Sequence, residues 1–256
     1  MRIIKFYLTA FIYSWGVWFL LPKAVVLNPY VLASIGGLGP VVALVLFLIT
    51  SDSSESRAFF IRLTNFKGIP KVLLISSVII PFAFSLLSNL FWGLPLSIDK
   101  EFAGAGIVYP LFLIVFGPIP EEMAWRGIAL DGINEKLGYF KAQSIVAVLW
   151  ASWHVPLFFI DGTYQSSLGI LTIEFWLFFM NIFILSFLTG WLYTKSKHSI
   201  IIAIIFHYTV NLSGEMFEST VNTELTKFFL YLFIYLFLEF ISNKNALFKT
   251  HFSPHK

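Results

Sequence analysis

The amino-acid sequence predicts an all-α fold, a polytopic membrane protein of about eight transmembrane helices. Hydrophobic residues make up 58% of the 256 residues and charged residues only 12%, whereas a soluble domain carries roughly 25% charged residues. The mean hydropathy is +0.82. Most of the apolar residues lie in runs close to the ~20 residues that a helix needs to cross a bilayer. Together these observations predict a single integral membrane domain over residues 1–256, without room for a second, soluble domain.

Eight apolar runs account for the predicted spans in order. They cover residues 3–21, 31–49, 72–92, 107–130, 142–160, 168–193, 199–217 and 225–241, with approximate ends for the fourth and seventh. The first run is too long for a signal peptide, and no cleavage site of small residues follows it, so we expect it to be retained. We expect the polar stretch 51–71 to be a flexible loop and the basic tail 243–256 to be disordered.

Basic residues are distributed unequally between the two ends of these spans. If the amino terminus lies inside, fourteen of the 17 Lys and Arg residues fall on the inner side, and only Lys23, Lys100 and Lys227 fall on the outer side. Because cytoplasmic segments of membrane proteins are enriched in basic residues, we expect both termini to lie in the cytoplasm.

Composition excludes several kinds of function. The chain contains no cysteine, so it can form neither a disulfide nor a thiolate nucleophile nor a cysteine zinc site. The formal net charge is only +3 and the basic residues lie in separate loops. This distribution does not favour nucleic-acid binding; the expected partners are the lipid bilayer and molecules within it.

The motif at residues 120–127, Pro-Glu-Glu-Met-Ala-Trp-Arg-Gly, places charges in an otherwise apolar region. Ionisable groups are expensive inside a membrane and usually mark a functional site. On a helix, Arg126 lies one turn after Glu122, so these two side chains can pair. Glu121 points about 100° away from Glu122 and is therefore expected to stay free as a general base.

Three more polar residues lie inside apolar runs, namely His154, His207 and Asn211. At 1.5 Å per helical residue, Glu121, His154 and His207 fall roughly 21, 20 and 12 Å into their spans. In a core ~30 Å thick, all three lie near mid-depth. Asn211 shares a helix face with His207, where its amide can donate to an oxyanion.

Each of these residues also has a structural explanation when it is considered alone. Glu121 and Glu122 could cap a helix beside an ordinary ion pair, and an intramembrane His or Asn often joins neighbouring helices by hydrogen bonding. Their joint occurrence at similar depth favours a hydrolytic site within the bilayer.

The order of these residues resembles the CAAX protease and bacteriocin-processing (CPBP) family, which includes the type II CAAX prenyl endopeptidase and Abi-type immunity proteins. The resemblance covers about residues 118–212 and lies in Glu121-Glu122-x-x-x-Arg126, Trp150-x-x-x-His154 and His207-x-x-x-Asn211. One departure is visible. The family usually carries Phe at the position of Trp150, which affects the size of an aromatic wall.

The resemblance implies an intramembrane endopeptidase, in a bacterial cell membrane, that cleaves a CAAX-type or bacteriocin-type peptide or protein. In the implied mechanism, Glu121 and His154 activate water as general base, and His207 and Asn211 stabilise the oxyanion. Glu122 and Arg126 orient the site.

Two histidines and a carboxylate are also a zinc ligand set, so zinc is possible. We favour metal-free catalysis, because the His-Glu-x-x-His spacing is absent and Arg126 would lie beside the metal.

Two other functions stay open at this point. One is a non-catalytic immunity or scaffold protein, in which the polar residues serve folding. The other is a proton-coupled transporter, which would be expected to show two related halves; the sequence shows no such repeat.

Overall fold

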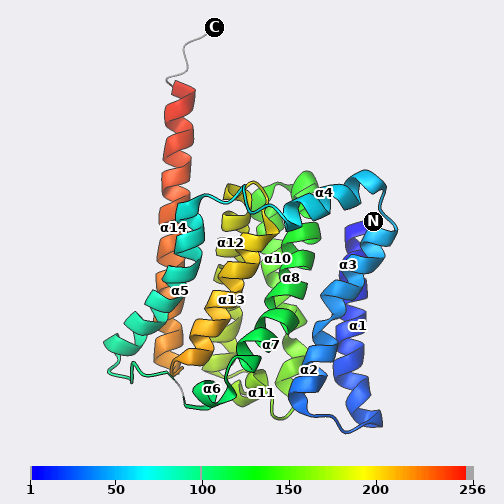
Figure 1. The fold of residues 1–256 in the computed structure, drawn as a ribbon, viewed down its shortest axis with the longest axis vertical. Helices are drawn as coiled ribbons and strands as arrows, with labels where there is room; N and C mark the ends of the chain where they lie inside the picture. Colours follow the sequence, from blue (N-terminus) through cyan, green and yellow to red (C-terminus); the bar gives the residue numbers. More distant parts are fainter. Residues whose placement is uncertain (1, 99, 252–256) are drawn as a thin grey trace.

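The computed structural model describes residues 2–98 and 100–251. Within these ranges the chain folds into helices joined by short turns, with no strand. Figure 1 shows most of the helices side by side and roughly parallel to one direction, as in a membrane bundle. The predicted fold class is therefore confirmed.

Six helical segments are long and apolar enough to cross a membrane. They are α1 (Arg2–Ala24), the pair α2 (Pro29–Gly37) and α3 (Gly39–Ile49), α5 (Lys71–Phe91), α10 (Tyr139–Trp153) with the 3-10 turn η2 (Val155–Phe159), α12 (Ile173–Lys195) and α14 (Val221–His251). A shorter apolar helix, α13 (Ile200–Met216), corresponds to the seventh predicted run.

The fourth predicted run is divided into short helices. It consists of α7 (Val108–Phe116), α8 (Pro118–Ala124), the π-helix η1 (Trp125–Leu130) and α9 (Asp131–Leu137). Gly117 separates α7 from α8 with a non-helical backbone. Broken helices are tolerated at membrane depth only where protein or a water-filled cavity surrounds them. Here α8 is largely buried and every residue of η1 is buried, whereas α7 has no buried residue.

The two ends of the described chain lie at the same end of the bundle (Figure 1), as an even number of crossings requires. The helix α4 (Ser53–Leu63), which follows α3, lies across that end, while the short helices α6 (Lys100–Ala105) and α11 (Tyr164–Leu168) lie at the opposite end. Which end faces the cytoplasm stays a prediction.

Three expectations about individual segments were wrong. The stretch 51–71 is not simply a loop, because it contains α4. The sixth span begins at Ile173 rather than near residue 168, after the separate helix α11. The last helix, α14, extends to His251 instead of giving way to a disordered tail at residue 243; residues 252–256 lie outside the described part of the chain.

Helix packing depends on small residues where two backbones approach. A Cβ atom on Gly39 of α3 would lie 2.1 Å from the Ser14 Oγ and 2.6 Å from the Ala10 carbonyl oxygen of α1. Small residues at such crossings are typical of membrane helix pairs. The chain therefore fixes α1 against α3 through contacts that only glycine allows.

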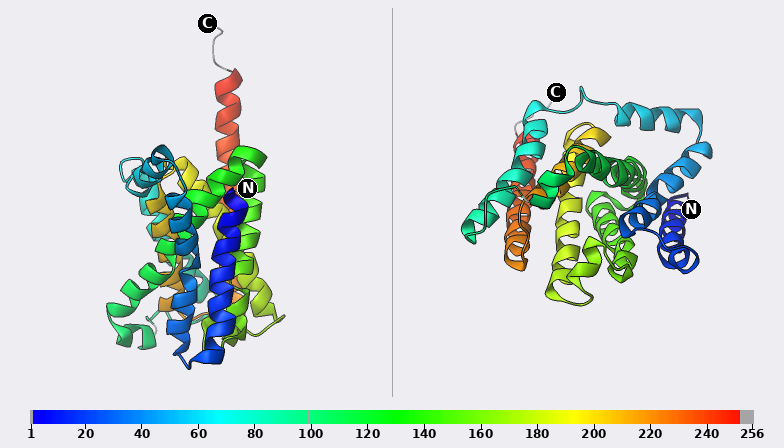
Figure 2. Two further views of the ribbon diagram at one scale, coloured as in Figure 1. Left: turned by 90° about the vertical axis from the view of Figure 1, so that its right-hand side faces the viewer. Right: turned by 60° about the horizontal axis from the view of Figure 1, so that its bottom comes forward.

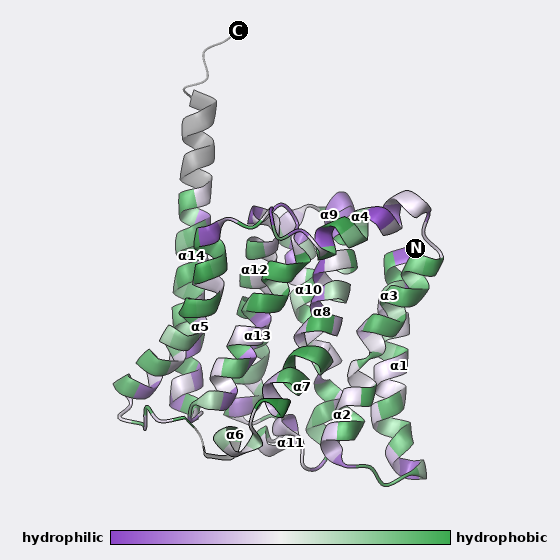
Figure 3. Cartoon of the chain, in the orientation of Figure 1, coloured by the Kyte–Doolittle hydropathy of each residue, from purple (hydrophilic) through white to green (hydrophobic). Residues whose placement is uncertain are grey.

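The outer surface of the bundle is apolar, as Figure 3 shows along the lengths of the helices. On α5, for example, the side chains of Val72, Ile79 and Leu90 are 66%, 58% and 62% exposed. A continuous surface of this kind is unusual in a soluble monomer and fits contact with lipid. The two views of Figure 2 show that the helices form a bundle rather than a flat layer.

Candidate active site

Glu122 lies on α8 and is completely buried. Its Oε1 atom accepts hydrogen bonds from Arg126 Nη1 at 3.0 Å and from His207 Nδ1 at 2.8 Å. The predicted pair of Glu122 and Arg126 is thus confirmed. The contact with His207 was not predicted, and it joins the broken helix to α13.

Arg126 lies at the start of the π-helix and is also completely buried. It donates to the carbonyl oxygen and hydroxyl of Ser186 on α12, at 3.2 and 3.1 Å, and its guanidinium carbon lies 4.7 Å from the Trp150 ring centre. Because a buried charge needs both a partner and hydrogen bonds, this arrangement holds α8, η1, α12 and α13 together.

Glu121, the neighbouring carboxylate, faces a different set of groups. Its Oε2 accepts a hydrogen bond from the indole N–H of Trp150 on α10. The expectation that Glu121 is free was therefore wrong for this oxygen. A carboxylate can accept several hydrogen bonds. Trp150 therefore fixes the orientation of the Glu121 carboxylate and leaves it able to accept further hydrogen bonds.

His154 follows the last residue of α10, at the start of the η2 turn that contains Pro156. Its Nδ1 lies 2.8 Å from the Trp150 carbonyl oxygen. Because a carbonyl can only accept, Nδ1 must carry the proton, which leaves Nε2 of the neutral ring as an acceptor. The same reasoning applies to Nδ1 of His207, which faces the Glu122 carboxylate.

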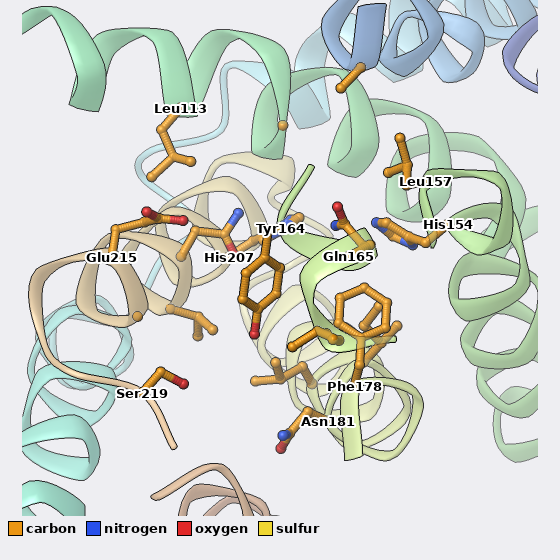
Figure 4. A pocket seen from close by; sticks show the side chains of 18 of the residues that line it. Leu113, His154, Leu157, Tyr164, Gln165, Phe178, Asn181, His207, Glu215 and Ser219 are labelled. Atoms are coloured by element: carbon orange, nitrogen blue, oxygen red, sulfur yellow. The ribbon is translucent and has the colours of Figure 1, made fainter. Parts of the chain in front are cut away.

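A cavity of about 630 Å³ brings these groups together (Figure 4). Four of the six predicted site residues line it: Glu121, His154, His207 and Asn211. The Trp150 ring centre lies 5.2 Å from that of His207 and 6.2 Å from that of His154, so it neighbours both histidines. The other two predicted residues, Glu122 and Arg126, are buried behind this lining.

Gly117 keeps open the space beside Glu121. A Cβ atom at this position would lie 4.0 Å from Glu121 Oε1, 3.8 Å from Asn211 Nδ2 and 3.1 Å from the Leu113 carbonyl oxygen. The carboxylate and the amide therefore both lie beside Gly117, at the wall of the same cavity.

Among the described residues, no three His, Asp or Glu side chains are arranged to hold a metal ion. Of the residues considered as zinc ligands, Glu121 accepts a hydrogen bond from Trp150 through Oε2, and His207 presents its Nδ1 proton to Glu122.

Sequence reasoning missed the roles of two residues in this arrangement. Trp150 was interpreted as part of a wall, although it departs from the Phe usual in the family, and only Trp has an indole N–H to donate. Ser186 gave no signal, because a serine in an apolar helix is common.

The sequence also matches known proteins. Residues 103–213 match the family model described as Rce1-like, type II CAAX prenyl endopeptidase. A protein named CAAX prenyl protease 2, from Methanococcus maripaludis, is 30% identical over 237 residues, which cover 86% of each chain. The chain belongs to the Rce1-like family.

Family membership supports an intramembrane endopeptidase that acts on membrane-associated proteins. The matched residues contain the whole of the broken helix, α10, α12 and most of α13. Every residue of the predicted site lies within this range.

Proposed function

We propose that this protein hydrolyses a peptide bond of a membrane-associated peptide or protein with a water molecule activated by Glu121 and His154. The observation that carries the proposal is that Glu121, His154, His207 and Asn211 line one cavity although they come from three separate segments. A purely structural role in helix packing would account for each of these residues separately. It would not require all four to face one cavity.

Glu121 is the proposed general base. Its carboxylate accepts a proton from the water, whose oxygen attacks the carbonyl carbon of the substrate. The unprotonated Nε2 of His154 accepts a hydrogen bond from the second proton of that water. This contact points the lone pair of the water oxygen towards the substrate carbonyl carbon. The Trp150 indole holds Glu121 in place from the other side.

His207 and Asn211 are the proposed oxyanion donors. The Asn211 amide can donate directly from its position beside Gly117. The Nδ1 of His207 donates to the Glu122 carboxylate at 2.8 Å, which fixes the ring, so donation to the oxyanion from Nε2 requires a second ring proton.

Collapse of the tetrahedral intermediate breaks the C–N bond. The leaving amine takes the proton from the Glu121 carboxylic acid, which returns the carboxylate to its initial state. In this mechanism Glu122 and Arg126 orient His207 and the broken helix, and they do not contact the substrate.

The substrate is proposed to be of the CAAX or bacteriocin type and to approach along the membrane. Phe112 and Phe116 of α7, Leu177 and Phe178 of α12 and other apolar side chains line the cavity together with the polar groups. A cavity of this composition suits an apolar or lipid-anchored segment next to the bond that is cleaved.

The substrate can be identified as the membrane peptide whose cleavage requires Glu121. Membranes from cells that produce the wild-type protein and the Glu121→Ala variant at equal abundance are compared by mass spectrometry. We expect longer peptides to accumulate, and their cleaved products to disappear, in the variant. Identical peptides in both would contradict the proposal and favour the scaffold function.

A further inference from the structure

A second cluster of polar side chains lies outside the cavity, at the end of the bundle that α4 crosses (Figure 1). Asp131, the first residue of α9, binds Arg62 of α4 through Oδ2. The same oxygen accepts a hydrogen bond from the Tyr193 hydroxyl of α12 at 2.7 Å, and Oδ1 lies 3.3 Å from His198 Nδ1. None of these four residues lines the cavity, so the proposed mechanism gives them no task.

Arg62 also reaches into the π-helix η1. Its Nη2 donates to the carbonyl oxygen of Gly127 at 2.9 Å. The other side of Gly127 is covered closely, because a Cβ atom there would lie 2.8 Å from Phe59 and 2.9 Å from Ile200. Gly127 directly follows Arg126 in the chain. The helix α4 therefore holds η1 at the residue next to the buried guanidinium of the site.

The π-helical form decides where two side chains of this segment point. Arg126 donates to Ser186 on α12, and Asp131 accepts from Tyr193 on the same helix. Ser186 and Tyr193 are seven residues apart, so they share a face of α12. On an α-helix, Arg126 and Asp131 would point about 140° apart. The wider turn of a π-helix, with its i→i+5 hydrogen bonds, reduces this angle, so the two contacts with α12 depend on it together.

The turn between α12 and α13 is held in an uncommon shape beside this cluster. Lys197 and His198 have φ angles of 52° and 57°, in a region that residues other than glycine seldom adopt. The Asn65 side chain donates to the Lys197 carbonyl oxygen at 3.2 Å, and the His198 ring centre lies 4.9 Å from that of Tyr193. Such a backbone persists only where its surroundings hold it. Here they hold it so that His198 meets Asp131.

We propose that Arg62 and Asp131 are positioning residues, which keep η1 in its π-helical form and so hold Arg126 between Glu122 and Ser186. This inference rests on the proposed function, because it concerns the orientation of the same site. Without these contacts η1 can relax towards an α-helix. Arg126 then moves relative to Ser186 and holds Glu122 less firmly, although every residue that lines the cavity is unchanged.

Kinetics of purified variants test the proposal, with the peptide that accumulates in Glu121→Ala cells as substrate. Arg62→Gln and Asp131→Asn should each lower kcat about tenfold, as expected for the loss of a hydrogen bond to a charged group, and leave KM within about twofold because the cavity is intact. Arg62→Lys should recover part of kcat, since an ammonium can bind Asp131 but lacks the fork that also reaches Gly127. Arg57→Gln is the matched control. Arg57 is exposed on the same helix, forms no hydrogen bond with a described residue, and should leave kcat unchanged.

Hydrogen–deuterium exchange separates a positioning role from a general loss of stability. Well below Tm, Arg62→Gln and Asp131→Asn should exchange faster in residues 122–131 and in α4, and as wild type elsewhere. If Arg62→Gln does not fold, Tyr193→Phe, which removes only the hydroxyl that donates to Asp131, takes its place in both measurements. Wild-type kcat in the folded variants would overturn the proposal. So would faster exchange throughout the chain with kcat reduced only in proportion to the folded fraction.

The exchange measurement needs no substrate, so it is independent of the peptide comparison between wild-type and Glu121→Ala cells. Cleavage that depends on Glu121 but is unchanged in the Arg62 and Asp131 variants would refute only this inference. Faster exchange confined to residues 122–131 and α4, without any cleavage that depends on Glu121, would support the contacts that hold η1 and refute the proposed function.

Discussion

Substitution of the two adjacent glutamates should separate catalysis from folding. Glu122→Gln removes the negative charge that faces Arg126 and His207, at 3.0 and 2.8 Å. Arg126 is completely buried, so its charge would be left without a carboxylate partner. Breaking a buried ion pair in this way costs about 3 to 5 kcal/mol, a large part of a typical folding stability of about 5 to 15 kcal/mol.

The expected effect is measurable as thermal stability of the purified protein in detergent. For a chain of this size, each 1 kcal/mol shifts Tm by about 2 to 4 °C, so Glu122→Gln should lower Tm by roughly 6 to 20 °C. Its abundance in the membrane should fall as well, because less stable protein is degraded.

Glu121→Gln is the matched control, since it makes the same chemical change one residue away. Glutamine keeps an oxygen that can accept from the Trp150 indole, and no described cation donates a hydrogen bond to Glu121. We expect Tm and abundance close to wild type, with cleavage abolished because the general base is lost.

A double variant tests the pairing itself. Glu122→Gln with Arg126→Met removes both charges, and replacing a buried pair by neutral groups is often close to neutral in stability. The double variant should recover at least half of the lost Tm. The reasoning would be refuted if Glu122→Gln were as stable as Glu121→Gln, or if the double variant were less stable than Glu122→Gln.

Four further outcomes follow from the structure. Trp150→Phe removes one hydrogen bond to a charged group, worth about 1.5 to 3 kcal/mol, and should lower kcat roughly tenfold to a hundredfold with little change in KM; a change confined to KM would make Trp150 a wall residue only. Reporter fusions at the two termini should both report a cytoplasmic location, and opposite sides would remove one of the predicted spans. Chelators should leave the activity of the purified protein unchanged, whereas activity lost to a chelator and restored by zinc would make the histidines and Glu121 metal ligands. Gly39→Ala should destabilise the protein because its Cβ atom would overlap α1, and Gly16→Ala, which meets nothing within 4 Å, should not; equal effects would show that the close contact between α1 and α3 is unimportant.

Local patterns in the sequence predicted much of the fold and part of the site. Apolar runs gave the spans, because a bilayer requires a fixed length of apolar helix. The pairing of Glu122 with Arg126 followed from helical spacing, since residues four apart share a face. Both inferences need only neighbouring residues, and both are confirmed by the structure.

Contacts between distant segments could not be predicted in the same way. The hydrogen bond from His207 to Glu122 joins positions 85 residues apart, and it depends on how α13 packs against α8. The π-helix that carries Arg126 is likewise invisible in hydropathy, because it differs from an α-helix only in its hydrogen bonding.

The helix α4 was missed although the sequence contained its signal. Asp52 accepts hydrogen bonds from the backbone N–H groups of Ser54 and Glu55 and so caps the helix. An Asp followed by Glu three residues later is typical of a helix start. The spans were predicted from long apolar runs, and α4 forms no such run because it lies across the end of the bundle rather than through it (Figure 1).

Isotope incorporation tests the central claim most directly. Purified wild-type protein and Glu121→Gln are each incubated with a membrane peptide found to accumulate in Glu121→Ala cells, in water enriched in ¹⁸O, and the products are weighed by mass spectrometry. Hydrolysis by activated water predicts a new carboxyl terminus containing ¹⁸O with the wild-type protein and no product with Glu121→Gln. Uncleaved peptide with the wild-type protein, or equal labelled product with both proteins, would contradict the account.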